Sequence, residues 1–191
     1  MKKLFLFAAV IFVSASYAQT EKGNWFAGSD LGLSYTSETI KGKYDGTEMT
    51  NKTESTLKFT PNVNYFVIDN LAVGLGLEYT NIKTKGVSDS KNMFTIAPNA
   101  TYFFPLSANL APFVGAKVGY AMASSAGSSD ANKDNGLVFG GKAGIAYFVN
   151  QGAAITGYVG YDSYSLKNKA DSKAETQRGI LGVGVGVALF F

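Results

Sequence analysis

The chain has 191 residues, a formal net charge of +3 and neither cysteine nor histidine. This length suits a single domain, the small charge gives no reason to expect a nucleic-acid partner, and the absence of cysteine excludes disulfide bonds. Without histidine or cysteine, the chain lacks the usual general base and the most reactive nucleophile. We therefore expect no enzyme, no cofactor and no metal site.

Residues 1–18 are expected to be a signal peptide. Two lysines precede an uninterrupted apolar run over 4–13, and small residues follow it up to Ala18. A run of this length is too short for a transmembrane helix, which needs about 20 residues. We predict cleavage after Ala18, which lowers the formal charge from +3 to +1 and leaves one domain over 19–191.

From Trp25 onward, apolar residues recur at every second position, which is the period of a strand whose two faces meet different surroundings. The second such segment is typical, with Leu57 and Phe59 on one face and Lys58 on the other. Eight segments of this kind follow one another along the chain, bounded by Trp25 and Tyr35, Leu57 and Tyr65, Leu71 and Tyr79, Phe94 and Tyr102, Leu110 and Tyr120, Leu137 and Tyr147, Ile155 and Tyr161, and Leu181 and Phe191.

The connections between these segments alternate in length. Short turns are predicted at 68–70, 105–109 and 150–152, and long polar loops at 37–52, 81–92, 123–135 and 165–177. Short periplasmic turns, long extracellular loops and an even number of strands are typical of bacterial outer-membrane barrels. The sequence therefore predicts an all-β fold, an eight-stranded antiparallel up-and-down transmembrane β-barrel.

The aromatic residues indicate which face of the barrel meets lipid. A soluble barrel would show the same period with its apolar face inside. Here Trp25 and Tyr35 stand ten residues apart on the apolar face, which places them about 25 Å apart along the membrane normal, the height of an outer-membrane apolar band. The predicted membrane-interface aromatics are Trp25, Tyr65, Tyr102 and Tyr147 near the turns and Tyr35, Tyr79, Tyr120 and Tyr161 near the loops. This placement favours an apolar face turned outward.

The opposite face carries charged residues, which we expect to point into the lumen because a lysine facing lipid costs roughly 2 to 4 kcal/mol at mid-membrane. Lys117 and Lys142, on neighbouring segments, would repel each other unless a carboxylate lies between them. Side chains nearly fill an eight-stranded barrel, so we favour a paired structural network over a gated ion path. The predicted lumen polar network is Asp30, Lys58, Glu78, Lys117, Lys142 and Asp162.

Two prolines fall in the middle of predicted strands. Pro61 interrupts the second segment and Pro98 the fourth. A proline cannot donate a hydrogen bond to a neighbouring strand, and a closed barrel has no edge strand to hold it. We expect a bulge or a register shift at each proline.

The whole region 19–191 resembles the small outer-membrane β-barrel family of the OmpA-domain and OmpX kind. The most specific element is the last segment, Gly186 to Phe191, which is similar to the C-terminal assembly signal of such proteins. The resemblance implies recognition of Phe191 by the barrel-assembly machinery and insertion among outer-membrane lipids. A periplasmic OmpA C-terminal domain is not expected, nor the wall-anchoring role that this domain would bring.

These observations predict a protein of the bacterial outer membrane. We expect a structural or surface-display role in adhesion or envelope integrity, with the long loops as the place for an extracellular ligand that the sequence does not identify. The alternative is a narrow porin-like channel for ions or small polar solutes.

Overall fold

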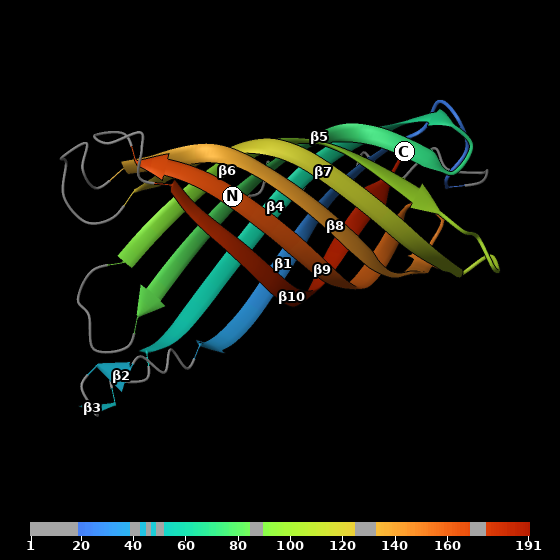
Figure 1. The fold of residues 1–191 in the computed structure, drawn as a ribbon. Coiled ribbons are helices and arrows are strands. Elements are labelled where there is room, and N and C mark those ends of the chain that lie inside the picture. Colours follow the sequence, from blue (N-terminus) through green and yellow to red (C-terminus); the bar gives the residue numbers. More distant parts are fainter. Residues whose placement is uncertain are drawn as a thin grey trace, which may run out of the picture.

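The computed structural model describes residues 19–38, 43–44, 47–48, 52–84, 90–124, 133–168 and 175–191. Within these ranges the secondary structure consists of strands, and no helix is long and apolar enough to cross a membrane. The barrel strands are β1 (Trp25–Glu38), β4 (Lys52–Ile68), β5 (Leu71–Thr84), β6 (Ser90–Phe103), β7 (Leu110–Ser124), β8 (Lys133–Asn150), β9 (Ala153–Asn168) and β10 (Glu175–Phe190). The short strands β2 (Lys43–Tyr44) and β3 (Thr47–Glu48) pair with each other (Figure 1).

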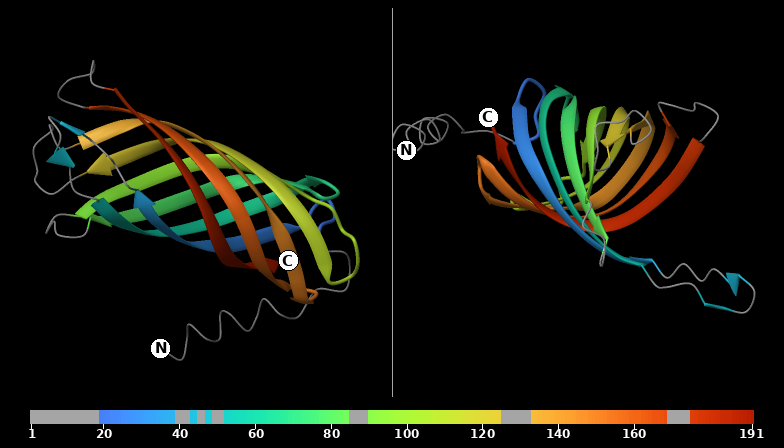
Figure 2. Two further views of the ribbon diagram at one scale, coloured as in Figure 1. Left: turned by 60° about the horizontal axis from the view of Figure 1, so that its bottom comes forward. Right: turned by 90° about the vertical axis from the view of Figure 1, so that its left-hand side faces the viewer.

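The eight barrel strands form one closed antiparallel ring in the order β1-β10-β9-β8-β7-β6-β5-β4. β1 pairs with β4 along its whole length, whereas its register with β10 runs from Phe26↔Phe190 to Gly32↔Gly184. Figure 2 shows tilted strands around an interior that no described strand crosses. This ring is the eight-stranded antiparallel up-and-down barrel that the sequence predicts, and the prediction of the fold class is confirmed.

Short connections join the strands at one end of the barrel, which we call the turn end. β4 passes into β5 through Asp69 and Asn70, and Asn70 adopts a left-handed backbone conformation with φ of 67°. β1 begins and β10 ends at the same end, where the backbone groups of Trp25 and Phe191 exchange two hydrogen bonds of 2.7 and 2.9 Å. The opposite end, which we call the loop end, is therefore where the four long predicted connections lie.

Outward and inward side chains alternate along the strands, as strand geometry requires. On β6, Thr95 and Ala97 point inward and are buried, whereas Phe94 and Ile96 point outward and are 41% and 40% exposed. Outward leucine, valine and isoleucine residues repeat this pattern on the other strands. A continuous apolar wall of this kind is stable against lipid and unstable against water.

The expectation of bulges at Pro61 and Pro98 is wrong. Pro61 keeps its pairing with Ser29 on β1, and the register between β4 and β5 is the same on both sides of it. Pro98 likewise keeps its pairing with Leu75 on β5 while the register with β7 stays constant. In an antiparallel sheet both backbone groups of a residue point to the same neighbour, so each proline loses one hydrogen bond to one strand and leaves the other ladder intact. The described register shifts lie instead beside the turns, between Phe66 and Ile68 and between Phe148 and Asn150.

The strands are longer than the apolar pattern indicates. Pairing between β5 and β6 continues to Lys83↔Ser90, inside the predicted loop 81–92. β1, β4, β7, β8, β9 and β10 also extend into the predicted loops. Apolar alternation ends where the lipid ends, but backbone hydrogen bonding continues into water, so the sequence pattern marks the membrane-embedded part of each strand and not its full length.

Candidate functional site in the barrel lumen

Four charged side chains meet in the middle of the lumen and form a closed ring of ion pairs, which we call the ion-pair tetrad. They are Lys58 on β4, Glu78 on β5, Lys117 on β7 and Asp162 on β9. Glu78 Oε2 lies 2.9 Å from Lys58 Nζ and 2.7 Å from Lys117 Nζ. Asp162 also pairs with both lysines, at 3.0 Å from Oδ1 to Lys117 Nζ and through a contact of Oδ2 with Lys58. Each ammonium group is therefore bound by both carboxylates, and the four charges sum to zero.

Glu78 is the most buried member of the tetrad, with 2% of its side chain exposed. Its second oxygen, Oε1, accepts hydrogen bonds from the hydroxyl of Tyr164 at 2.7 Å and from Thr80 Oγ1 at 3.4 Å. Both carboxylate oxygens are thus bound, which is the condition under which a buried charge is tolerated.

A glycine makes room for the tetrad. Gly140 lies between Lys117 and Asp162 in the strand register, paired with one on β7 and with the other on β9. A Cβ atom at Gly140 would lie 2.1 Å from Asp162 Oδ1 and 2.6 Å from Lys117 Cε. The ion pair occupies the space that any side chain at this position would need.

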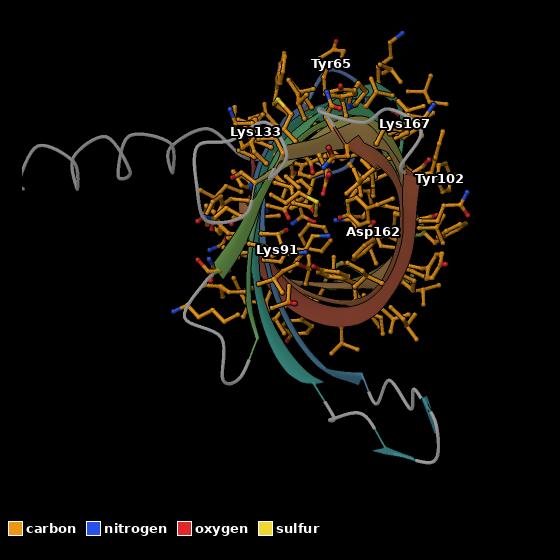
Figure 3. The ribbon with its side chains drawn as sticks, turned by 60° about the vertical axis from the view of Figure 1, so that its left-hand side comes forward. Tyr65, Lys91, Tyr102, Lys133, Asp162 and Lys167 are labelled. Carbon is orange, nitrogen blue, oxygen red and sulfur yellow. The ribbon has the colours of Figure 1, made fainter. Side chains whose placement is uncertain are left out.

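The two remaining charges of the predicted network lie apart from the tetrad or outside the described side chains. Lys142 faces the lumen nearer the turn end, with its Nζ 5.2 Å from the centre of the Tyr158 ring and 5.7 Å from that of Phe113. Asp30 occupies an inward register position opposite Thr60, but its side chain lies outside the described part of the chain. Figure 3 looks into the barrel from the loop end and shows Asp162 reaching from the wall into the lumen.

Toward the turn end, six phenylalanines from six strands fill the lumen, and we call them the phenylalanine plug. Their rings pack against one another, with centroids 5.1 Å apart for Phe148 and Phe190 and 5.4 Å apart for Phe26 and Phe190. None is more than 6% exposed. β5 and β9 contribute small alanines at the same level, which leaves space for the rings. The plug consists of Phe26, Phe66, Phe103, Phe113, Phe148 and Phe190.

Our sequence analysis missed the plug, although the sequence carries a signal for it. Five of the six phenylalanines stand next to another aromatic residue at the turn end of a strand. Successive side chains of a strand point to opposite faces, so each aromatic doublet places one ring outside the barrel and one inside. The doublets are Trp25-Phe26, Tyr65-Phe66, Tyr102-Phe103, Tyr147-Phe148 and Phe190-Phe191.

A second apolar cluster lies in the lumen on the other side of the tetrad, toward the loop end. Met93, Ala121, Val138 and Tyr164 are buried there, and Tyr164 connects the cluster to Glu78 through its hydroxyl group. We call this group the loop-end cluster. Apolar side chains therefore lie on both sides of the tetrad along the barrel axis.

The outward members of the doublets and the loop-end tyrosines lie on the outer face. Trp25 packs against Tyr65 with ring centroids 5.0 Å apart, and Tyr102 packs against Phe104 at 4.8 Å. Figure 3 shows Tyr65 and Tyr102 on the outside of the wall. The exposed outward aromatics also include Tyr79, Tyr120, Tyr147, Tyr161 and Phe191, while the side chain of Tyr35 lies outside the described part of the chain.

The arrangement consists of paired charges between two regions of apolar packing. The described residues include no cluster of three or more acidic side chains able to hold a metal ion. Between the phenylalanine plug and the tetrad lies a cavity of about 110 Å³, the lumen cavity, lined by residues of both. Asparagine and threonine side chains line part of its wall, and apolar groups of the plug and of the strands line the rest.

Comparisons with known proteins agree with this architecture. The sequence profile described as "Outer membrane protein beta-barrel domain" matches residues 5–188. Neisserial surface protein A has a structure similar to this chain, with a TM-score of 0.61 at 18% identity over 94% of this chain and 100% of that one. OprG from Pseudomonas aeruginosa gives 0.54 at 16% identity over 92% and 99% of the two chains. The N-terminal β-barrel domain of OprF from the same organism gives 0.53 at 16% identity over 90% and 100%.

Sequence identities this low establish a shared fold and no shared activity. A search of curated protein sequences finds no match. The family profile, in contrast, spans nearly the whole chain. The protein therefore belongs to the outer membrane protein β-barrel domain family and is a protein of the bacterial outer membrane.

Proposed function

We propose that this protein is a structural, non-enzymatic barrel that displays its loops at the cell surface for adhesion or envelope integrity and does not conduct ions. The observation that supports this proposal is the phenylalanine plug, which fills the turn end of the lumen with rings from six strands. An ion passing the plug would lose its hydration shell without receiving polar partners in exchange. The lumen then serves to hold the wall together.

The ion-pair tetrad also supports the proposal of a structural barrel that does not conduct ions. Each of its charges already has two opposite partners, so a passing ion would have to compete with existing contacts. Long charged side chains that reach across the lumen connect β4, β5, β7 and β9, which are not all neighbours in the ring. Such cross-lumen contacts stiffen the barrel that carries the loops.

Three further parts of the proposal concern export, assembly and the surface. Residues 1–18 act as a cleaved signal peptide, and the barrel-assembly machinery recognises the last strand through Phe191. Phe191 stands on the outer face with half of its surface exposed, where an assembly factor or lipid can reach it. An extracellular ligand binds at the long loops, most of whose residues lie outside the described ranges.

A narrow channel for ions or small polar solutes is the second candidate. The lumen cavity favours it, because polar side chains line part of this cavity and it reaches from the tetrad to the plug. A channel would require the plug to move aside. The two candidates therefore differ in whether the folded wild-type barrel carries current.

Single-channel recording of the refolded chain 19–191 in a planar bilayer tests the proposal. We expect a folded wild-type barrel to be silent, and a variant with Lys117→Met and Lys142→Met to be silent as well. A matched control carries Lys83→Met and Lys167→Met, which removes the same charge from two exposed positions on the outer face. Discrete wild-type openings that change with the lumen pair and not with the control pair would overturn the display proposal in favour of the channel.

Replacement of the loops tests the display role itself. Within the predicted loops 123–135 and 165–177, exchanging only 125–132 or 169–174 for a glycine-serine linker leaves the strands β7 to β10 and the lumen residues they carry unchanged. We expect cells to lose the adhesion or envelope phenotype while the barrel still assembles. An unchanged phenotype after exchange of all four long loops would contradict display.

A further inference from the structure

Residues 19–24 lie at the turn end of the barrel, ahead of β1, and we call them the N-terminal strap. Hydrogen bonds fix the strap to the connection between β4 and β5. The backbone N–H of Asn70 donates to the carbonyl of Thr20 at 2.7 Å, and Thr20 Oγ1 donates to Asn70 Oδ1 at 2.6 Å. The backbone N–H of Lys22 donates to Asp69 Oδ1 at 2.8 Å. Thr20 is thereby buried, with 8% of its surface exposed.

The strap also holds the backbone of the phenylalanine plug. The N–H of Gly23 donates to the carbonyl of Phe66 at 2.9 Å, and the N–H of Phe66 donates to the carbonyl of Asn24 at 2.9 Å. Phe66 is fully buried. Buried backbone groups need hydrogen-bond partners, so loss of the strap would leave both groups of Phe66 unsatisfied at the closed end of the lumen.

Gln19, the first residue of the strap, is held more loosely than Thr20. Its side-chain Nε2 donates to the carbonyl of Asn150, at the end of β8, over 3.4 Å, which is longer than an ordinary N–H···O hydrogen bond. This contact lies at the exposed surface of the turn end. The side-chain amide nitrogen of Gln19 therefore contributes little to the fold and is open to reaction.

Cleavage after Ala18, which is part of the proposed function, makes Gln19 the first residue of the chain. A free α-amino group then lies on the same residue as a side-chain amide. The pKa of α-amino groups is about 8, so near neutral pH an appreciable fraction is unprotonated and can act as a nucleophile. The chain has three glutamines, Gln19, Gln151 and Gln177, and this cleavage gives a free α-amino group to Gln19 alone.

The α-nitrogen can attack the side-chain carbonyl carbon, Cδ, of the same residue. A bond between the α-nitrogen and Cδ forms and closes a lactam ring, while the bond between Cδ and Nε2 breaks. Nε2 takes up the proton that the α-nitrogen loses and leaves as ammonia. The step exchanges one amide for another, so it needs no oxidant, reductant or co-reactant. It also removes the positive charge of the N-terminus.

We propose that Gln19 is a modification site, at which cyclisation of the N-terminal glutamine gives a pyroglutamyl residue that protects the strap from aminopeptidases. The proposal rests on the cleavage after Ala18 in the proposed function. Loss of Nε2 gives up only the long bond to Asn150, while the hydrogen bonds of Thr20, Lys22 and Gly23 stay in place. The ring leaves no free α-amino group for an aminopeptidase to recognise.

Analysis of the N-terminus tests the proposal on protein isolated from the outer membrane of its native host. We expect the wild-type chain to give no residues in Edman degradation, and its intact mass to lie below that of unmodified 19–191 by one ammonia. The matched control is Gln19→Ala, expressed with residues 1–191 in the same cells. It cannot cyclise, so Edman degradation should give Ala-Thr-Glu-Lys.

The outcomes separate the modification from the cleavage on which it rests. A wild-type chain that reads Gln-Thr-Glu-Lys at the unmodified mass would overturn the modification and leave the cleavage standing. A chain that begins at another residue would overturn both. A Gln19→Ala chain that is also blocked would overturn the assignment of the block to Gln19.

Protection of the strap has its own readout. Both proteins, folded in vesicles, are incubated with an aminopeptidase of broad specificity, and the intact mass is followed with time. We expect the wild-type chain to keep its mass and the Gln19→Ala chain to lose at least its first residue. Equal trimming of the two chains would overturn the protective role. Equal resistance would overturn it as well, because the hydrogen bonds of the strap would then account for the protection.

Discussion

Glu78 is the charged residue with the most deeply buried side chain among the described residues. It binds both lysines of the tetrad through Oε2 and accepts from Tyr164 through Oε1. In Glu78→Gln, two buried ammonium groups would have to share Asp162. Removing one partner of a buried ion pair is unfavourable by roughly 3 to 5 kcal/mol, and we expect a loss of this order in the free energy of unfolding measured by urea titration in vesicles.

A second substitution separates the charge effect from a packing effect. Adding Lys117→Met to Glu78→Gln leaves Lys58 and Asp162 as a neutral pair, so the double variant should recover a large part of the loss. Lys83→Gln, on the exposed outer face, should change the free energy by less than about 0.5 kcal/mol. A double variant as unstable as Glu78→Gln would contradict the electrostatic account of the tetrad.

Asp162 and Lys117 pack so closely against Gly140 that a side chain at this position should destabilise the barrel. In Gly140→Ala the new Cβ would displace Asp162 and Lys117, whose atoms lie 2.1 and 2.6 Å from its position. We expect a loss of about 1 to 3 kcal/mol in the free energy of unfolding, as for other overpacked interiors. The matched control is Gly157→Ala on the outer face, where no atom lies within 4 Å of the new Cβ and the effect should be neutral or slightly stabilising. Equal effects at the two glycines would contradict the packing described around the tetrad.

The aromatic doublets give a prediction at the level of the strand. Within one doublet on β4, Phe66 is fully buried in the plug while Tyr65 faces outward. Phe66→Ala should lower the free energy of unfolding by roughly 3 to 5 kcal/mol, because it leaves a cavity among the rings. Tyr65→Ala, which exchanges ring contacts for contacts with lipid, should have the smaller effect in the same urea titration. The reverse order would mean that the register assigned to β4 is wrong.

The existence of the strands and their inward and outward faces could be predicted from the sequence because period-2 alternation is imposed directly by the contrast between lipid and lumen. The prolines misled the prediction, since an alternating pattern does not tell which neighbouring strand a missing N–H group faces. The sequence analysis missed the phenylalanine plug for a related reason. Phe66 and Phe103 occupy positions of otherwise polar parity, and the pattern gives no sign that the lumen turns apolar near the turns.

The alternating pattern of single strands also could not predict which charged residues form the tetrad. Alternation puts Lys58, Glu78, Lys117, Lys142 and Asp162 at inward positions, but it does not set their heights along the barrel. The height follows from the register between strands, which places Gly140 between Lys117 and Asp162. Lys142 stands two residues closer to the turn end on β8, where aromatic rings are its neighbours.

At the scale of the whole molecule, the barrel joins an apolar outer wall to a lumen that is packed at two levels and polar between them. The plug closes the turn end, the loop-end cluster lies on the other side of the tetrad, and the lumen cavity lies between the plug and the tetrad. In the proposed function this arrangement supports the loops, and the phenylalanine plug interrupts the polar lining of the lumen at the turn end. The central claim is that the interior is closed to solutes from both sides of the membrane.

Thiol accessibility in the cavity tests this claim most directly, because the chain has no cysteine and any introduced thiol is unique. Thr101, 5% exposed, lines the lumen cavity, and Lys83 is exposed near the loop end. In vesicles that contain the refolded barrel, the account predicts that Thr101→Cys resists a charged methanethiosulfonate reagent added on both sides of the membrane, while Lys83→Cys reacts within the mixing time. Rapid modification of Thr101→Cys in a correctly folded barrel would contradict a closed lumen and would support the channel instead.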